Sequence, residues 1–219
     1  MIIKRNRTSS LDIDHALYLY FLGLSTRSVS KAIFHLNKVK RSHVAIWKWI
    51  QKYTPQKMSI KRKRISEFII GDTLIKVGLE YIWLWVTIEP ENREILALSI
   101  SKERNMFVAE RFPDGLIKIH GKHGVSTDGD GLIKIHGKHG VSTDGGTWYP
   151  QACRFLKLKH HIHSSLEKSL IERTMQYLKD RTESFDDYFP CRIKNCRLKH
   201  VSNWLNMFSD YHNKEVNNA

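Results

Sequence analysis

The sequence predicts an α/β protein with a mixed sheet and flanking helices, preceded by an all-α domain. Apolar residues recur at helical spacing as far as about residue 53. From Phe68 onward, three apolar runs of strand length follow one another with short turns between them. Beyond these runs, amphipathic helical stretches alternate with shorter apolar segments. The chain therefore divides into a helical first part and a larger α/β part.

Positive charge is concentrated in the first part. The 219 residues include 36 Lys and Arg against 22 Asp and Glu, a formal net charge of +14. Residues 1–66 hold 15 of these basic residues and only two acids, Asp12 and Asp14, whereas the rest holds 21 basic and 20 acidic residues. A basic excess confined to one module is typical of contacts with nucleic-acid phosphates. A merely solubilising surface fits less well, because the rest of the chain is balanced.

Several protein classes are excluded by what the sequence lacks. The apolar stretches are interrupted within a few residues by Lys, Glu or Gly, so no membrane span is expected. Residues 1–7 lack the apolar core of a secretion signal. Three cysteines give no disulfide framework. We therefore expect a cytoplasmic, nucleoid-associated protein with no membrane partner.

Residues 1–56 are expected to form three short helices. The first starts near Ser10 and ends at Gly23, the second covers 24–33, and the third runs from His43 to Tyr53 after a cap at Ser42. Asp12 or Asp14 is expected to cap the first helix, and Ser25 or Thr26 the second.

The third helix has an apolar and a polar side. The residues expected to point inward are Val44, Ile46, Trp47 and Ile50. The residues expected to face DNA are His43, Lys48, Gln51 and Lys52. Three helices with a glycine-containing turn and a basic last helix predict a helix-turn-helix domain, although such bundles also serve as packing modules. The charge of this part favours DNA binding in the major groove.

A basic segment, residues 57–66, follows Thr54-Pro55 and is expected to link the two domains. Its four consecutive basic residues are Lys61, Arg62, Lys63 and Arg64. Such a run cannot pack internally, so we expect it to follow the DNA backbone. A solvated linker without a DNA role is the alternative.

Residues 67–189 are expected to form the α/β domain, followed by a C-terminal extension over 190–219. The expected strands are 68–77, 81–88 and 95–100 in an antiparallel meander, and the expected helices are 104–112, 148–156 and 166–182. The buried side of the last of these helices is expected to carry Leu166, Leu170, Ile171, Met175 and Leu178. Three strands followed by alternating helices and strands is the order of a ribonuclease H-like domain.

A tandem duplication interrupts this domain. Residues 114–129, DGLIKIHGKHGVSTDG, are repeated without change as residues 130–145. Solenoid repeats diverge and number at least three, so two identical copies indicate a recent duplication. We expect one copy to supply a core strand and the other to loop out or join an edge. The duplicated His-x-x-His pairs (His120/His123 and His136/His139) need no metal to explain them.

Three acids are candidates for a metal-dependent site. Phosphodiester chemistry uses two divalent ions about 3.5–4 Å apart, held by oxygen ligands. Asp72 lies in the first strand, Asp144 follows the run Val141–Thr143, and Glu172 lies on the last long helix. Each acid taken alone has an ordinary explanation, because Asp-Gly usually marks a turn and a helical Glu is usually solvated.

The strings around these acids resemble the insertion-sequence family-six DDE transposases. VSTDGGTWYP at 141–150 is followed by Glu172, which lies 28 positions after Asp144, and then by KDRT at 179–182. The similarity extends to IIGDTLIKVG, to YIWLWVTIEP and to the basic head, so it spans most of the chain. Asp128 is the weaker candidate for the middle acid, because it lies 44 positions from Glu172 and lacks the GTWYP continuation.

The resemblance implies the site and its partners. Asp144 and Glu172 would be the second and third metal-binding acids, and Lys179 would contact the DNA end. Arg173, beside Glu172, is a further candidate for DNA binding. Two Mg²⁺ or Mn²⁺ ions would serve the cutting and rejoining of DNA strands. The protein would act as a homo-oligomer on double-stranded DNA, both at the element's terminal inverted repeats and in the target.

The first acid departs from this family pattern. The family usually has Asp-Glu-Thr here, whereas this chain has Gly71-Asp72-Thr73. Neighbouring strand residues point to opposite faces, so Asp72 can be the first metal ligand only if the strand slips or bulges. Gly71 and the duplication favour an inactive remnant that only binds DNA, whereas the retained acids favour an active transposase. A ribonuclease H-type nuclease without strand transfer is the third alternative.

A zinc site is the last candidate. Cys191-x4-Cys196-x3-His200 could be completed by His160, His161 or His163. The spacing matches no common zinc finger, and the resemblance implies none. We therefore expect no zinc there.

Overall fold

The computed structural model of the chain describes residues 8–52, 65, 67–77, 80–120, 125–127, 133–135, 140–183 and 198–218. The basic run 61–64, the two cysteines Cys191 and Cys196, and Asp128 lie outside the described residues. The chain divides into two compact units, Met1–Pro55 and Gln56–Ala219.

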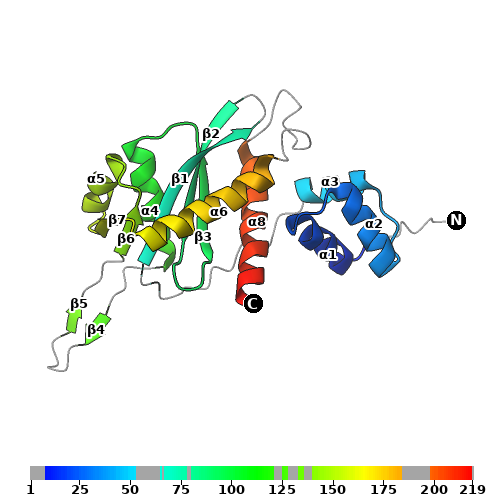
Figure 1. Ribbon diagram of the computed structural model, residues 1–219, viewed down its shortest axis with the longest axis horizontal. Coiled ribbons are helices and arrows are strands. Elements are labelled where there is room, and N and C mark those ends of the chain that lie inside the picture. The colour runs from blue at the N-terminus through cyan, green and yellow to red at the C-terminus, as the bar shows by residue number, and fades with distance from the viewer. Residues whose placement is uncertain are drawn as a thin grey trace. The chain divides into compact units, whose positions relative to one another are not determined.

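The first unit consists of three helices (Figure 1). They are α1 (Ser10–Phe21), α2 (Thr26–Asn37) and α3 (His43–Lys52). Gly23 ends α1 with φ of +124°, a conformation that glycine adopts without a steric penalty. As predicted, Ser25 caps α2, where its side chain accepts a hydrogen bond from Ser28 N.

The cap of α1 differs from the prediction. The Ser9 hydroxyl accepts a hydrogen bond from Asp12 N at 3.0 Å, so neither Asp12 nor Asp14 is the cap. The Asp12 carboxylate instead accepts a hydrogen bond from Asn37 Nδ2 at 2.7 Å. This acid therefore joins the start of α1 to the end of α2.

The core of the helical unit uses all three helices. Its buried residues are Ala16, Leu17, Phe21, Val29, Ile33, Ile46 and Ile50. The prediction for Val44 is wrong, because 46% of this residue is exposed. Ile46 and Ile50 are one helical turn apart and share the buried face, whereas Val44, two residues earlier, lies on the other side of the helix.

The second unit is built on a five-stranded mixed sheet. The strands in chain order are β1 (Glu67–Val77), β2 (Glu80–Ile88), β3 (Ile95–Ser101), β6 (Gly140–Thr143) and β7 (Lys159–Ile162). Their order across the sheet is β3-β2-β1-β6-β7. The first three are antiparallel, while β6 runs parallel to β1 and β7 parallel to β6. This arrangement confirms the predicted ribonuclease H-like α/β fold.

Helices pack against this sheet. The helices α4 (Met106–His120) and α5 (Trp148–Phe155) share a core with Phe68, Ile70 and Trp85 of β1 and β2. The helix α6 (Ser165–Glu183) crosses β1, and α8 (Leu198–Asn218), in the segment expected as an extension, packs against β3 (Figure 1). Asn213 of α8 pairs with the backbone of Ile95. No helix in the described part of the chain is long and apolar enough to cross a membrane.

The buried side of α6 is narrower than predicted. Ile171, Met175 and Leu178 are at most 8% exposed, as the pattern indicated. Leu166 is 85% exposed, so its predicted burial is wrong. It lies in the first turn, one turn before the buried stripe begins.

The duplication is divided between three structures. The helix α4, predicted to stop at Phe112, continues through the first copy as far as His120. The end of the first copy supplies β4 (Val125–Thr127), which pairs only with β5 (Ile133–Ile135) from the start of the second copy. The end of the second copy supplies β6 of the main sheet, as expected for one copy.

Candidate functional site

The three candidate acids lie on β1, after β6 and on α6. β1 and β6 are parallel neighbours whose last paired residues are Ile69 and Ser142. Two residues further on come Gly71 within β1 and Asp144 just beyond β6. Glu172 lies in the second turn of α6, which packs on β1. The acids therefore come from adjacent elements, and the direction of each side chain decides what they can do together.

Asp72 and Gly71 point to opposite faces of the sheet. The pairing of β1 with β2 runs without a register shift from Ile69 to Val77, so the strand neither slips nor bulges at Asp72. A Cβ at Gly71 would meet Ile171 Cγ1 of α6 at 2.7 Å. Asp72 instead accepts a hydrogen bond from Tyr149 Oη of α5 at 2.7 Å. The family's first acid would thus face α6, and Asp72 faces away from it.

The Asp72 carboxylate is enclosed. Its side chain is 1% exposed, and Oδ1 lies 2.9 Å from Arg104 Nε. Burial raises the pKa of Asp72, while the Tyr149 hydrogen bond and the Arg104 charge act to lower it. Burial next to Asp72 also raises the pKa of Tyr149. Asp72 therefore belongs to a buried cluster in which Arg104 supplies the positive charge.

Arg104 is a site residue that the sequence reasoning missed. Its Nη2 lies 3.4 Å from Asp144 Oδ2, so it joins Asp72 and Asp144. The guanidinium carbon lies 4.7 Å from the ring centre of Trp83 and 4.6 Å from that of Trp148. Aromatic faces attract such a cation. No local pattern marks Arg104, since all four partners are distant in sequence.

Asp144 is partly exposed at the end of β6. Its Oδ1 accepts a hydrogen bond from Gly146 N at 3.0 Å, and 45% of the side chain is accessible. Gly145 between them has φ of +83°, which favours glycine. The Asp-Gly-Gly segment thus forms the turn that carries the chain from β6 to α5.

Glu172 lies on the accessible side of α6. Its side chain is 65% exposed, and Lys168 Nζ is 3.9 Å away. Burial lowers the pKa of His163, whereas the carboxylates of Glu167, Asp144 and Glu172 act to raise it. The ring Nδ1 of His163 lies 2.7 Å from Ser142 Oγ. The structure thus connects Asp144 with Asp72 through Arg104 and leaves Glu172 outside that cluster.

Apart from the basic run 61–64, which lies outside the described residues, the predicted DNA-contacting residues lie on two helices. On α6, Lys179 follows Glu172 by two turns, and Arg173 is exposed with Nη2 2.8 Å from Ser169 Oγ. On α3, His43 and Lys48 are exposed and Gln51 is half-buried. The side chain of Lys52 lies outside the described residues.

A two-metal site does not fit these residues as they stand. Asp72, Asp144 and Glu172 form no cluster of ligand atoms, and Arg104 already supplies the positive charge beside the two aspartates. Gly71 offers no side-chain oxygen on the face that α6 covers. Within the described part of the chain, only Glu67, His161 and Glu167 bring three possible ligand atoms within 4.8 Å of one another.

A sequence comparison with known proteins covers both units. No protein-family profile matches the chain. It is 29% identical over 213 residues to an uncharacterized protein of Methanocaldococcus jannaschii, across 97% of this chain and 90% of that one. This similarity therefore spans the helical head and the α/β unit.

Viral integrases are among the similar solved structures. One is an intasome of simian T-cell lymphotropic virus in complex with PP2A regulatory subunit B56 gamma, with 14% identity, a TM-score of 0.44 and coverage of 89% of this chain and 60% of that chain. This chain thus spans less than two thirds of that relative. Another is the HTLV-2 integrase catalytic core domain in complex with magnesium, with 16% identity, a TM-score of 0.44 and coverage of 66% and 85%.

Proposed function

We propose that this chain is a DNA-binding protein of the family-six transposase kind whose strand-cutting site lacks its first metal ligand. The loss of the first metal ligand is supported by the positions of Gly71 and Asp72 on β1. The position of β1 that faces α6 has no side chain, and the neighbouring carboxylate is buried on the other face with Tyr149 and Arg104. Asp144 and Glu172 remain as two of the three acids that the resemblance implies.

Binding to double-stranded DNA is supported by the head. Three helices precede the α/β unit, and the exposed side of α3 carries His43 and Lys48. Residues 1–66 hold 15 basic residues against two acids. Neutralising phosphates with such residues gives an affinity that falls steeply with salt. The resemblance further implies a homo-oligomer on the DNA, which sedimentation of the complex would measure.

An active strand-cutting enzyme that uses Asp72 is the second candidate. It is favoured by Arg104, which contacts both Asp72 and Asp144 and so keeps these carboxylates near each other. In that case Asp72→Ala would abolish cutting. If the first candidate is correct, Asp72→Ala lowers stability and leaves no cutting activity to lose.

The test is Mg²⁺- or Mn²⁺-dependent cleavage and joining of labelled DNA from the flanks of the protein's own gene. We expect the native chain to bind this DNA and leave it uncut. Gly71→Asp should restore cutting only weakly, because its Cβ would meet Ile171 Cγ1 at 2.7 Å. Gly71→Asp with Ile171→Ala should cut more, because the second change makes room.

Two matched controls make the result specific. Ile171→Ala alone removes the same packing without adding an acid and should stay inactive. Adding Glu172→Ala to the double variant should abolish the restored cutting. Absence of DNA binding would overturn the proposal as a whole. Intact binding without cutting in any variant would remove Asp144 and Glu172 as metal ligands. Cutting without joining would favour the nuclease.

A further inference from the structure

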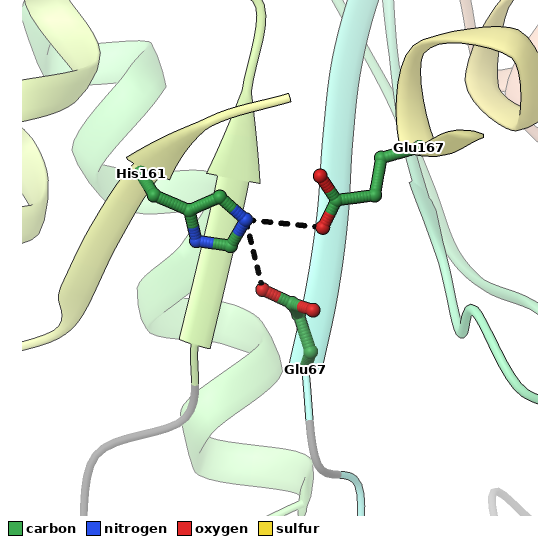
Figure 2. A group of neighbouring side chains, drawn as sticks. All are labelled: Glu67, His161 and Glu167. Carbon is green, nitrogen blue, oxygen red and sulfur yellow. Dashed lines mark hydrogen bonds and ion pairs between the residues drawn. The ribbon is translucent and has the colours of Figure 1, made fainter. Parts of the chain in front are cut away.

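Three side chains from separate elements converge at the edge of the sheet beside the start of α6. Figure 2 shows Glu67 of β1, His161 of β7 and Glu167 of α6 pointing toward one another. We call them the Glu67–His161–Glu167 cluster. None of them is among the acids of the proposed strand-cutting site.

The spacing of their atoms suits a tetrahedral ion. His161 Nε2 lies 3.0 Å from Glu167 Oε1 and 3.4 Å from Glu67 Oε1. All three ligand atoms are within 4.8 Å of one another. Zinc holds nitrogen and oxygen ligands at about 2.0–2.2 Å in a tetrahedron, which places the ligand atoms roughly 3.3 Å apart. Small side-chain movements would therefore bring all three onto one ion.

The Glu167 carboxylate is held in place by a residue outside the cluster. Ser164 N donates to Glu167 Oε2, and Glu167 N donates to Ser164 Oγ, so Glu167 is fixed by a capping box at the start of α6. This leaves Oε1 directed at His161. Hydrogen bonds of this kind orient the ligands in metal sites. A Cβ at Gly140 would lie 2.9 Å from Glu67 Oε1, so the glycine leaves the space that this carboxylate occupies.

The capping box explains Glu167 but not Glu67. The Glu67 side chain is 25% exposed and lies beside a second acid. Burial and then the Glu167 charge raise the pKa of Glu67. A divalent ion would supply two positive charges for the two carboxylates, Glu67 and Glu167. The imidazole favours zinc over magnesium, which prefers oxygen ligands.

We propose that the Glu67–His161–Glu167 cluster binds a zinc ion, with a fourth position open to water. The ion would join the start of β1, the edge strand β7 and the first turn of α6. It would thereby fix the beginning of the helix that carries Glu172, five residues after Glu167. Its role is structural and independent of strand cutting.

The test is a titration of the full chain with Zn²⁺ alone, followed by calorimetry and melting temperature, and with Co²⁺ followed by its visible absorption. We expect one tight ion per chain, a higher melting temperature and the intense absorption of tetrahedral Co²⁺. Glu67→Gln and His161→Gln should each lower the affinity at least tenfold. Gly140→Ala keeps all three ligands but displaces the Glu67 carboxylate, so it should also weaken binding.

Three controls separate this site from others. His160→Gln changes a neighbour whose ring contacts Thr143, and it should bind zinc as the native chain does. Glu172→Gln should also bind normally, since it belongs to the proposed cutting site. Cys191→Ser with Cys196→Ser should likewise retain the ion. Loss of zinc in the cysteine variant with retention in folded His161→Gln would overturn the proposal, as would no binding by the native chain.

Discussion

The two copies of the sixteen-residue repeat have identical sequences and different structures. Residues 116–120, LIKIH, form the last part of α4, whereas Ile133–Ile135 of the same string form β5. Val125–Thr127 pair only with β5, whereas Val141–Thr143 lie in the main sheet between β1 and β7. Within the described residues, the first copy therefore contributes to α4 and β4, and the second copy contributes to β5 and β6.

The difference shows that the surrounding structure decides whether a segment compatible with both a helix and a strand forms one or the other. In the first copy, LIKIH extends a helix that begins at Met106, and adding a residue to an existing helix avoids the cost of nucleation. Leu116 and Ile117 are then buried, with 1% and 6% exposure. In the second copy, the described residues that precede IKI are those of β4, and the β-branched residues of IKI also suit a strand. Context therefore outweighs local preference here.

The largest expected effect comes from matched substitutions that compare the two copies of the repeat. Leu116→Ala should lower the free energy of unfolding by about 2–5 kcal/mol, since it empties a buried site. Leu132→Ala, at the matching position of the second copy, should lower it by less than about 1 kcal/mol, because the strand that follows it, β5, pairs outside the main sheet. Urea denaturation of both variants measures the difference. Equal losses would mean that both copies contribute equally to the core.

A smaller effect is expected from removing one copy. Deleting residues 124–139 joins His123 to Gly140 and restores a single DGLIKIHGKHGVSTDG. The connection from α4 to β6 falls from 19 residues to three, which should raise the free energy of unfolding by about 1–2 kcal/mol. A Gly/Ser segment of equal length in place of 124–139 should leave stability unchanged. A large loss on deletion would show that the β4–β5 pair supports the main sheet.

The smallest effect on stability concerns the duplicated aspartate. Asp144→Asn and Asp128→Asn should each change the free energy of unfolding by less than about 1 kcal/mol, because the Asp144 side chain is 45% exposed and its ion pair is screened. Their effects on DNA cutting should differ. In the Gly71→Asp, Ile171→Ala background, only Asp144→Asn should abolish cleavage of labelled DNA. Loss with Asp128→Asn instead would assign the middle acid to the first copy.

Much of the fold was predictable because it rests on local patterns. Apolar runs separated by short turns predicted the antiparallel β1–β2–β3 meander, and Ser25 followed by a helical stripe predicted the start of α2. Boundaries were less predictable. The prediction stopped α4 at Phe112, because the repeat that begins at Asp114 was expected to supply a strand or a loop. Val44 and Leu166 failed because one apolar residue at a helix start does not fix the buried face.

The site was predictable only in part. Alternation along β1 predicted that Gly71 and Asp72 face opposite ways, and the unbroken register of that strand agrees. The partners of Asp72 were not predictable. Tyr149 is 77 positions away from Asp72, and Arg104 is 40 positions from Asp144. Such contacts depend on how the elements pack, and no pattern of neighbouring residues in the sequence predicts them.

The connection between α4 and β6 is also a natural insertion point. The chain between His120 and Gly140 already carries an extra copy, while β6 keeps its place between β1 and β7. Connections that accept added residues often also accept whole folded domains whose ends lie close together. We expect a fluorescent reporter placed there to fold beside an intact sheet. Such a fusion would report the position of the protein while leaving both termini unmodified.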